Sequence, residues 1–333
     1  MLYGLLFGGV SFSQEKDIPD QSEKVIFITG GTRGIGYQTA LALARKNPAH
    51  IYISGRNQTT ADKALASIKS AVPSAKVSYL PCDLADLESV KSCAREFLNR
   101  EKRLDLLFLN AGIMVTPAGK SKQGYEIQFG TNHIGHFLLT KLLLPTLEKT
   151  TSLPGTDVRI ISVSSIAHYF APCQGIVFSE LKTEMESWLS MRRYGQSKLA
   201  NILFTKQLAK QLKNQDSKIL AVSIHPGVVD TGLYEYIEKW PIFSVFLKIA
   251  RKMMIFLMNA KEGANTQLWA ATAPRATEKD VQSCCSRSNG KVVVGEFYTP
   301  IGAPGQAGKL TYDDGLAKKL WEWTEEEVKD YTL

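Results

Sequence analysis

Short apolar runs alternate with helix-length segments along almost the whole chain. Strands are predicted at Lys24–Thr29, His50–Ser54, Lys76–Leu80, Leu104–Leu109, Val158–Val163 and Lys218–Ile224. The helices between them are predicted at Gly34–Lys46, Ala61–Ser70, Leu87–Asn99, Gln123–Leu147 and Met191–Leu212. Strands that alternate with helices of this length predict a parallel sheet with right-handed crossovers. We therefore expect one doubly wound α/β domain at 24–300, between a lead-in at 1–23 and a tail at 301–333.

A glycine-rich loop follows the first predicted strand. Gly30, Gly34 and Gly36 lie between that strand and the first helix. Glycines at this place permit a tight turn, and they let backbone N–H groups and the helix N-terminus approach a pyrophosphate. The loop therefore predicts a dinucleotide site, with a plain glycine-rich turn as the alternative.

The end of the second strand bears on the choice of dinucleotide. An Asp or Glu roughly twenty positions beyond the glycines would bind the ribose 2′-OH and repel a 2′-phosphate. The chain has Ser54-Gly55-Arg56 there, with no acidic residue before Asp62, and a second arginine, Arg33, lies inside the loop. Two guanidinium groups without a carboxylate favour NADP(H) over NAD(H), unless both point into solvent.

Tyr194 and Lys198 are four residues apart near the start of the helix that is predicted to end at Leu212. This spacing places both side chains on one face of the helix. A free tyrosine has a pKa of about 10, and a neighbouring ammonium lowers that pKa by stabilising the phenolate. The pair is therefore a candidate acid/base, although most pairs of this kind are only surface contacts.

Six motifs occur in a fixed order along the chain. They are the glycine loop, Asn110-Ala111-Gly112, Asn132, Ser164-Ser165, the Tyr194/Lys198 pair and Pro226-Gly227. In this order, over residues 24–300, they resemble the short-chain dehydrogenase/reductase family. The segments Asn132–Phe137 and Ser197–Asn201 are similar to its retinol-dehydrogenase-like branch, and Lys16–Asp20 and Gly295–Tyr298 resemble fungal members of that branch. The resemblance implies a single Rossmann-type sheet of about seven strands, helices on both faces and a helical lid.

The resemblance also implies a role for each matching residue. Tyr194 would exchange a proton with the substrate, Lys198 would assist it and hold the nicotinamide ribose, and Ser165, aligned in preference to Ser164, would hydrogen-bond the substrate oxygen. Asn132 would hold a water that relays protons from Lys198. Asp83 would contact the adenine and Thr231 the nicotinamide carboxamide. The implied cofactor site comprises Gly30, Thr32, Arg33, Gly34, Ile35, Gly36, Arg56, Asp83, Leu84, Asn110, Ala111, Gly112, Tyr194, Lys198, Pro226, Gly227, Val229 and Thr231.

Two segments are expected on the substrate side. The gap between Ser165 and Tyr194 is wider than in compact family members, so Ala171–Ser190 is interpreted as a substrate-side loop. The nearly apolar segment Trp240–Met258 falls where the family has its lid, which is expected within residues 232–260. An apolar lid implies a lipophilic substrate. Three central basic residues argue against a membrane-spanning helix and leave contact with an anionic membrane surface open.

Composition limits the other classes of function. The 40 Lys and Arg residues exceed the 32 Asp and Glu, but they are dispersed, so nucleic-acid binding is not expected. The five cysteines form no CxxC pair, which is typical of a reduced, cytoplasmic protein. An apolar N-terminus leaves association with a membrane or lipid droplet open. No carboxylate or cysteine completes a metal set with the histidines His133, His136, His168 and His225, so no metal is expected.

We therefore expect an NADP(H)-dependent oxidoreductase that interconverts a carbonyl and an alcohol on a lipophilic small molecule, acting as a ketone or aldehyde (carbonyl) reductase. An intermediate of secondary metabolism and a retinoid- or sterol-like lipid are the candidate substrates. The alternative is a non-catalytic NADP(H)-binding redox sensor or scaffold, which would have no chemical need for Ser165, Tyr194 and Lys198. The sequence does not indicate an oligomeric state.

Overall fold

One parallel sheet organises the protein. The computed structural model describes residues 9–229, 258–277, 279–280 and 290–333. In this part of the chain seven strands pair in the order β3-β2-β1-β4-β5-β6-β7, and all pairs are parallel. They are β1 (Val25–Thr29), β2 (His50–Gly55), β3 (Val77–Pro81), β4 (Leu106–Leu109), β5 (Arg159–Val163), β6 (Leu220–Ile224) and β7 (Phe297–Tyr298). The order reverses at β1 and β4, so the predicted doubly wound sheet is confirmed.

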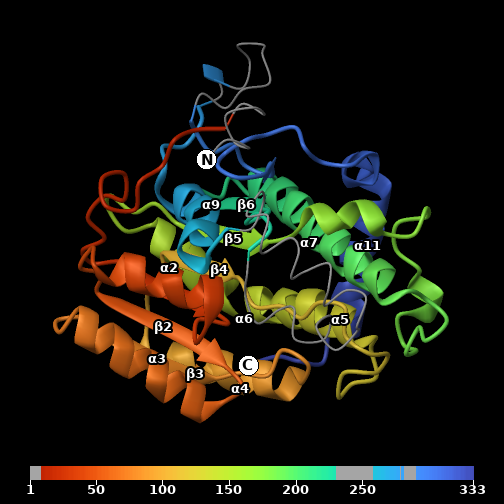
Figure 1. Cartoon of the computed structure of the whole chain (residues 1–333). Helices are drawn as coiled ribbons and strands as arrows, with labels where there is room; N and C mark the ends of the chain where they lie inside the picture. The colour runs from red at the N-terminus through yellow and green to blue at the C-terminus, as the bar shows by residue number, and fades with distance from the viewer. Residues whose placement is uncertain (1–8, 230–257, 278, 281–289) are drawn as a thin grey trace.

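Helices cover both faces of the sheet (Figure 1). One face packs against α2 (Gly34–Ala44), α3 (Gln58–Ala71) and α9 (Ala260–Thr272). The other packs against α4 (Leu87–Arg100), α6 (Gly135–Thr151), α7 (Ser190–Asn214) and α11 (Asp314–Glu327). None of the helices in the described ranges is both long and apolar enough to cross a membrane.

The central strands β1, β4, β5 and β6 are mostly apolar because both of their faces are buried. In β1, Phe27 faces the α4 side, where its ring meets Phe97 edge-on at 5.3 Å between centroids. Its neighbours Ile26 and Ile28 face the α2 side, and all three side chains are completely buried. Each such side chain contributes about 1.5–3 kcal/mol by leaving water. This two-sided burial fixes the register and brings the carboxyl ends of the strands to one edge.

The helix predicted at Gln123–Leu147 begins later and ends later than expected. Gly124 has a left-handed φ of +87°, and α5 (Ile127–Phe129) starts only after Glu126, whose carboxylate caps the amide of Phe129. A π-helical turn, η1 (Gly130–Ile134), then joins α5 to α6. The predicted start was wrong because a turn glycine and a side-chain cap override the helical pattern before residue 127.

The segment after β7 contains ordered structure. A 3₁₀ turn, η5 (Lys309–Tyr312), leads into α11, whose Trp321 stacks on Phe204 of α7 at 5.8 Å between ring centroids. Thr324 of α11 also bonds the ring of His133, 3.1 Å away. The end of the chain thus packs on the same side of the sheet as α6 and α7.

Candidate active site

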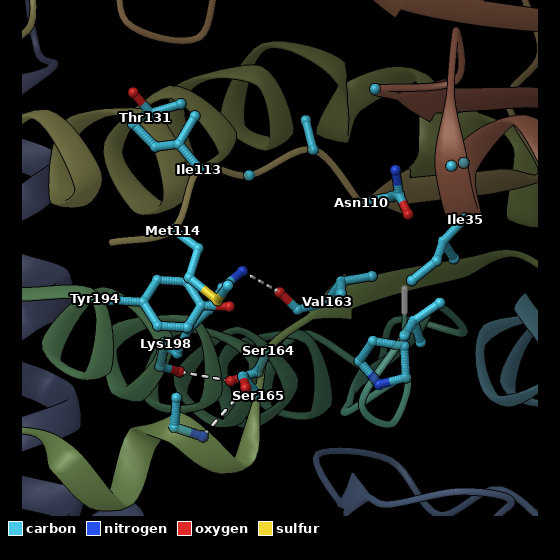
Figure 2. A pocket seen from close by; sticks show the side chains of 18 of the residues that line it. Ile35, Asn110, Ile113, Met114, Thr131, Val163, Ser164, Ser165, Tyr194 and Lys198 are labelled. Carbon is cyan, nitrogen blue, oxygen red and sulfur yellow. Dashed lines mark hydrogen bonds between the residues drawn. The ribbon is translucent and has the colours of Figure 1, made fainter. Parts of the chain in front are cut away.

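A pocket of about 460 Å³ opens at the carboxyl ends of the strands. Its wall draws on the loops after β1, β2, β3, β4, β5 and β6 and on the first turns of α7. Figure 2 shows Tyr194, Lys198 and Met114 gathered at one end, with Asn110 and Ile35 at the other. The edge where strand order reverses is the usual place for ligands in open α/β sheets.

The glycine loop lies at one end of the pocket. Gly30 has a φ of +65°, which disfavours any other residue type. A Cβ on Gly36 would come within 2.4 Å of the Gly30 oxygen and 2.5 Å of Asn110 Nδ2. Asn110 in turn donates to the backbone oxygen of Thr29 at 2.8 Å. The loop is therefore packed against β4, and the N-terminus of α2 faces the pocket, as an anionic ligand requires.

The two arginines singled out in the sequence line this same end of the pocket. Arg33 is the N-cap residue of α2, and Arg56 follows the last residue of β2. A Cβ on Gly55, the residue before Arg56, would lie 3.2 Å from the side chain of Thr32, the residue before Arg33. The loops that carry both guanidinium groups therefore meet, and the described residues at this end of the pocket include no carboxylate.

Asp83 is placed beside the pocket and not in its wall. Its carboxylate accepts the amide of Ala85 at 3.0 Å, and its own amide donates to Ser89 Oγ at 2.9 Å. The neighbouring Cys82 and Leu84 are the residues that line the pocket. The loop after β3 thus reaches the pocket, with Asp83 shaping the turn.

Tyr194 and Lys198 meet at the other end of the pocket. Both are buried, and Lys198 Nζ lies 5.7 Å from the centre of the Tyr194 ring. Nζ donates to the backbone oxygen of Val163 at 2.9 Å. Complete burial lowers the pKa of Lys198 to about 7, because the ammonium has lost most of its water. The lysine is thus poised to exchange its proton near neutral pH.

Asn132 lies in the π turn, behind the wall of the pocket. Its amide nitrogen donates to Ile113 O at 3.0 Å and to Ser197 Oγ at 2.9 Å, and its oxygen accepts the Ile113 amide at 2.9 Å. A Cβ on Gly112 would lie 3.2 Å from Asn132 Oδ1 and 3.4 Å from Lys198 Nζ. The amide and the ammonium therefore approach the same point in the loop after β4.

The two serines after β5 have different surroundings. Ser164 is buried, and its hydroxyl donates to the backbone oxygen of Lys198 at 2.7 Å. Both serines line the pocket, but Ser165 is less buried, and its hydroxyl accepts the amide of Ala167 at 3.1 Å. Ser165 is therefore the serine whose hydroxyl proton is still available for an oxygen in the pocket.

Residues after β6 complete the described wall. Pro226, Gly227 and Val229 line the pocket, and Gly227 has a φ of +98°. Thr231 and residues 232–257 of the expected lid lie outside the described residues. The remaining members of the expected cofactor site, Thr32, Gly34, Ala111 and Gly112, also line the pocket.

Residues 171–190, the insert expected as a substrate-side loop between Ser165 and Tyr194, are not among the described residues that line the pocket. Phe170 and Met191, which flank the residues 171–190, line the pocket. Within the insert, Val177 donates its amide to Gln196 of α7 at 2.8 Å, and Phe178 meets Trp323 of α11 at 6.0 Å between ring centroids. The middle of the insert thus packs on α7 and α11.

The sequence did not identify several residues that line the pocket. Met114, Phe170, Met191 and Val228 are apolar residues of its wall, and His225 adds a neutral imidazole whose pKa burial lowers to about 3. Three of the four apolar residues flank a predicted motif or the insert without belonging to it. In the sequence, only their closeness to a predicted motif or to the insert could have indicated a place in the pocket wall.

The loop that carries Met114 is held in a strained conformation. Val115 has a left-handed φ of +51°, which is rare for a β-branched residue. Its amide donates to Gln128 Oε1 at 2.7 Å, and the next carbonyl, of Thr116, accepts from Ser190 Oγ at 2.6 Å and from Arg193 at 3.1 Å. These bonds hold the Met114 loop in the pocket wall, and strained backbone is often found at functional sites.

Comparison with known proteins gives a consistent set of relatives. Residues 24–242 match the family model for short chain dehydrogenases. The chain is 39% identical over 316 residues to an uncharacterized oxidoreductase of Schizosaccharomyces pombe, which covers 94% of this chain and 87% of that protein. It is 37% identical over 309 residues to the human polyprenol dehydrogenase, covering 92% of this chain and 86% of the human one.

A solved structure shares the whole architecture. A putative uncharacterized protein from Mycobacterium paratuberculosis superposes with a TM-score of 0.68 at 27% sequence identity. The match covers 96% of this chain and 98% of the other.

Proposed function

The chain belongs to the short-chain dehydrogenase/reductase family, and from this we propose that it is an NADP(H)-dependent reductase. Its reaction would convert the carbonyl of a lipophilic small molecule to an alcohol. The observation that carries the proposal is the single pocket wall that joins the glycine loop at one end to Ser165, Tyr194 and Lys198 at the other. A nucleotide held at the first end would extend its nicotinamide toward the second.

The residues present fit a dinucleotide. The loop after β1 leaves no room for a Cβ at Gly36, and the start of α2 offers unpaired backbone N–H groups to a pyrophosphate. Arg33 and Arg56 would hold a 2′-phosphate, since no carboxylate of the described residues lines that end. The loop after β4, with Asn110, Ala111 and Gly112, would lie alongside the cofactor. When bound, NADPH supplies the hydride.

Tyr194 would donate the proton that the reduced oxygen requires. The buried ammonium of Lys198 stabilises the phenolate that remains, because opposite charges interact strongly where water is excluded. The bond from Lys198 to Val163 holds the ammonium at this end of the pocket. Asn132, which approaches Gly112 beside Lys198, would complete the path by which Tyr194 recovers its proton.

Ser165 would orient the substrate oxygen. Its hydroxyl already accepts the amide of Ala167, so its own proton is directed to another acceptor. A carbonyl oxygen bonded to both Ser165 and Tyr194 would be polarised toward the charge that develops on it.

Two observations support an apolar substrate: the apolar residues of the pocket wall and the name of one relative. Met114, Phe170, Met191 and Val228 are apolar residues of the pocket wall, and Phe170 is 58% exposed although it lines the pocket. The 37% identical human relative is called a polyprenol dehydrogenase, which names a long isoprenoid alcohol. An apolar wall with few polar groups fits the class of lipophilic carbonyls.

Replacement of Tyr194 tests the proposed chemistry. Tyr194→Phe keeps the ring and removes only the hydroxyl, so we expect reduction of carbonyl probes by NADPH to fall at least a thousandfold while the Kd for NADPH changes less than threefold. Turnover and fluorescence titration measure the two. Undiminished turnover in the variant would contradict the role of Tyr194.

The rival function is a non-catalytic NADP(H)-binding sensor or scaffold. It would be favoured if the wild-type protein bound NADPH but oxidised it with none of a panel of aromatic, isoprenoid and steroid carbonyls. The catalytic function is favoured by the arrangement of Ser165, Tyr194 and Lys198 at one end of the pocket. A sensor would gain nothing from a buried lysine of lowered pKa.

A further inference from the structure

His168 follows three residues after Ser165, and both of its ring nitrogens are hydrogen-bonded to backbone groups. It belongs to the 3₁₀ turn η2 (Ile166–Phe170), and it is buried. Nδ1 is 2.7 Å from the backbone oxygen of Ser165. On the opposite side of the ring, the amide of Gly308 donates to Nε2 at 2.9 Å. One imidazole thus spans two segments that are far apart in the sequence.

The chemistry of these two bonds fixes the tautomer. The amide of Gly308 can only donate, so Nε2 must carry a lone pair. The proton of the neutral ring is then on Nδ1, where it is donated to the carbonyl of Ser165. Burial lowers the pKa of His168, and although the hydrogen bond to the Ser165 oxygen raises it, the nearby charge of Lys206 on α7 lowers it again, so the net shift is downward. His225, the other titratable group that interacts with it, is itself neutral, so the ring is uncharged at neutral pH.

The turn η2, to which His168 belongs, forms part of the pocket wall. Ser165 is the N-cap residue of η2, and Ala167 and Phe170 line the pocket with it. A Cβ on Gly195 would come within 2.6 Å of the Ala167 oxygen, so the turn is pressed against α7 next to Tyr194. Any shift of η2 therefore changes the distance between the serine and the tyrosine.

The other side of His168 is held by the chain beyond β7. Its ring lies tilted against that of Tyr169, with 4.3 Å between centroids, and meets Phe297 edge-on at 5.3 Å. The Tyr169 hydroxyl donates to the Gln306 oxygen at 3.3 Å, and a Cβ on Gly308 would lie 3.1 Å from the Tyr169 ring. Residues 306–308 thus lie directly on η2, and both His168 and Tyr169 join the two segments by hydrogen bonds.

We propose that His168 is a positioning residue, which holds Ser165 in place for the substrate oxygen by tying its backbone to the segment 306–308. The activity part of this inference rests on the proposed function. The two bonds make separate contributions: the bond from Nδ1 orients Ser165, and the bond to Nε2 anchors the turn η2 to the segment 306–308. His168 touches neither cofactor nor substrate in this role, since the pocket wall does not include it.

Two substitutions separate these bonds. In His168→Asn the side-chain N–H replaces the donor at Nδ1, and the acceptor for Gly308 is lost. In His168→Gln the longer side chain replaces the acceptor at Nε2, and the donor to Ser165 is lost. With 4-nitrobenzaldehyde as the probe carbonyl, we expect kcat of the Gln variant to fall at least fivefold below that of the Asn variant. The Kd for NADPH should change less than threefold in both.

Hydrogen exchange reports the second bond without any need for turnover. We expect the amide of Gly308 to exchange at least tenfold faster in the Asn variant and within threefold of wild type in the Gln variant. His50→Gln, at a half-buried imidazole bonded to Ser78 and outside the pocket, is the control and should alter neither measurement.

The outcomes distinguish the two proposals. Equal kcat values for the Asn and Gln variants, or equal exchange at Gly308, would overturn the role of His168. A wild-type protein that reduces no carbonyl would contradict the proposed function, and exchange at Gly308 would still decide whether His168 anchors the segment 306–308.

Discussion

The ammonium of Lys198 donates a 2.9 Å hydrogen bond to the backbone oxygen of Val163, the last residue of β5. Asn201 donates to the same oxygen at 3.2 Å, so that carbonyl would stay bonded without the lysine. The charge of Lys198 is therefore not needed to satisfy the fold. Its burial lowers its pKa to about 7, which means that the folded protein bears a free-energy cost for keeping a cation beside Tyr194.

Lys198→Met should separate stability from activity. Methionine fills a similar volume without a charge, and Asn201 continues to satisfy Val163. Because buried charges replaced by apolar groups are often neutral or stabilising by about 1–4 kcal/mol, we expect an equal or higher free energy of unfolding at pH 6, together with loss of carbonyl reduction. Chemical denaturation and turnover measure the two. Lys206→Met, on the same helix but outside the pocket, should keep the activity.

The stability difference between this variant and the wild type should depend on pH. The folded pKa of Lys198, about 7, lies below the unfolded value of 10.5, so the unfolded state binds more protons between these values. Wild-type stability relative to Lys198→Met therefore rises with pH in this window. We expect a relative gain of about 2–3 kcal/mol from pH 6 to pH 9. Denaturation of both proteins at the two pH values checks it, and a constant difference would argue for a lysine of ordinary pKa.

Much of the fold could be predicted because its signals are local. The apolar run at Val25–Thr29 and the glycines that follow need only their own neighbours in sequence to be interpreted. The bond between His168 and Gly308 could not be predicted, because it joins residues 140 positions apart whose meeting depends on the placement of β7. The apolar wall at Met114 is a similar case. Its loop is fixed by bonds to Gln128 and to α7, and no sequence pattern records them.

The glycine loop should tolerate no side chain at Gly36. In Gly36→Ala the new Cβ would meet the Gly30 oxygen at 2.4 Å and Asn110 Nδ2 at 2.5 Å, both far inside contact distance. Because the loop must open to relieve this, we expect the Kd for NADPH to rise at least thirtyfold and the melting temperature to fall by several degrees. Gly119→Ala, where no atom lies within 4 Å of the new Cβ, is the matched control and should bind normally.

Cofactor preference should depend on Arg56. If its guanidinium binds a 2′-phosphate, Arg56→Ala removes a charge-assisted pair of about 1.5–3 kcal/mol, which is roughly ten- to a hundredfold in affinity. We expect the Kd for NADPH to rise accordingly while that for NADH stays within twofold. Fluorescence titration with both nucleotides measures this. Equal affinities of the wild type for NADPH and NADH would contradict the assignment of NADP(H).

The two adjacent serines offer a test of which hydroxyl acts on the substrate. Ser164→Ala removes the bond to the Lys198 oxygen, and Ser165→Ala removes the cap on Ala167, so each variant should lose about 1 kcal/mol of stability. Both serines line the pocket, but only Ser165 has a hydroxyl proton that is not already donated to the backbone, so its loss should also lower kcat by about a hundred- to a thousandfold. Turnover at saturating NADPH, measured beside thermal unfolding, distinguishes the variants. Because the two variants should lose similar stability, a difference in their kcat values reports contact with the substrate. A greater loss of kcat in Ser164→Ala would therefore reverse the assignment.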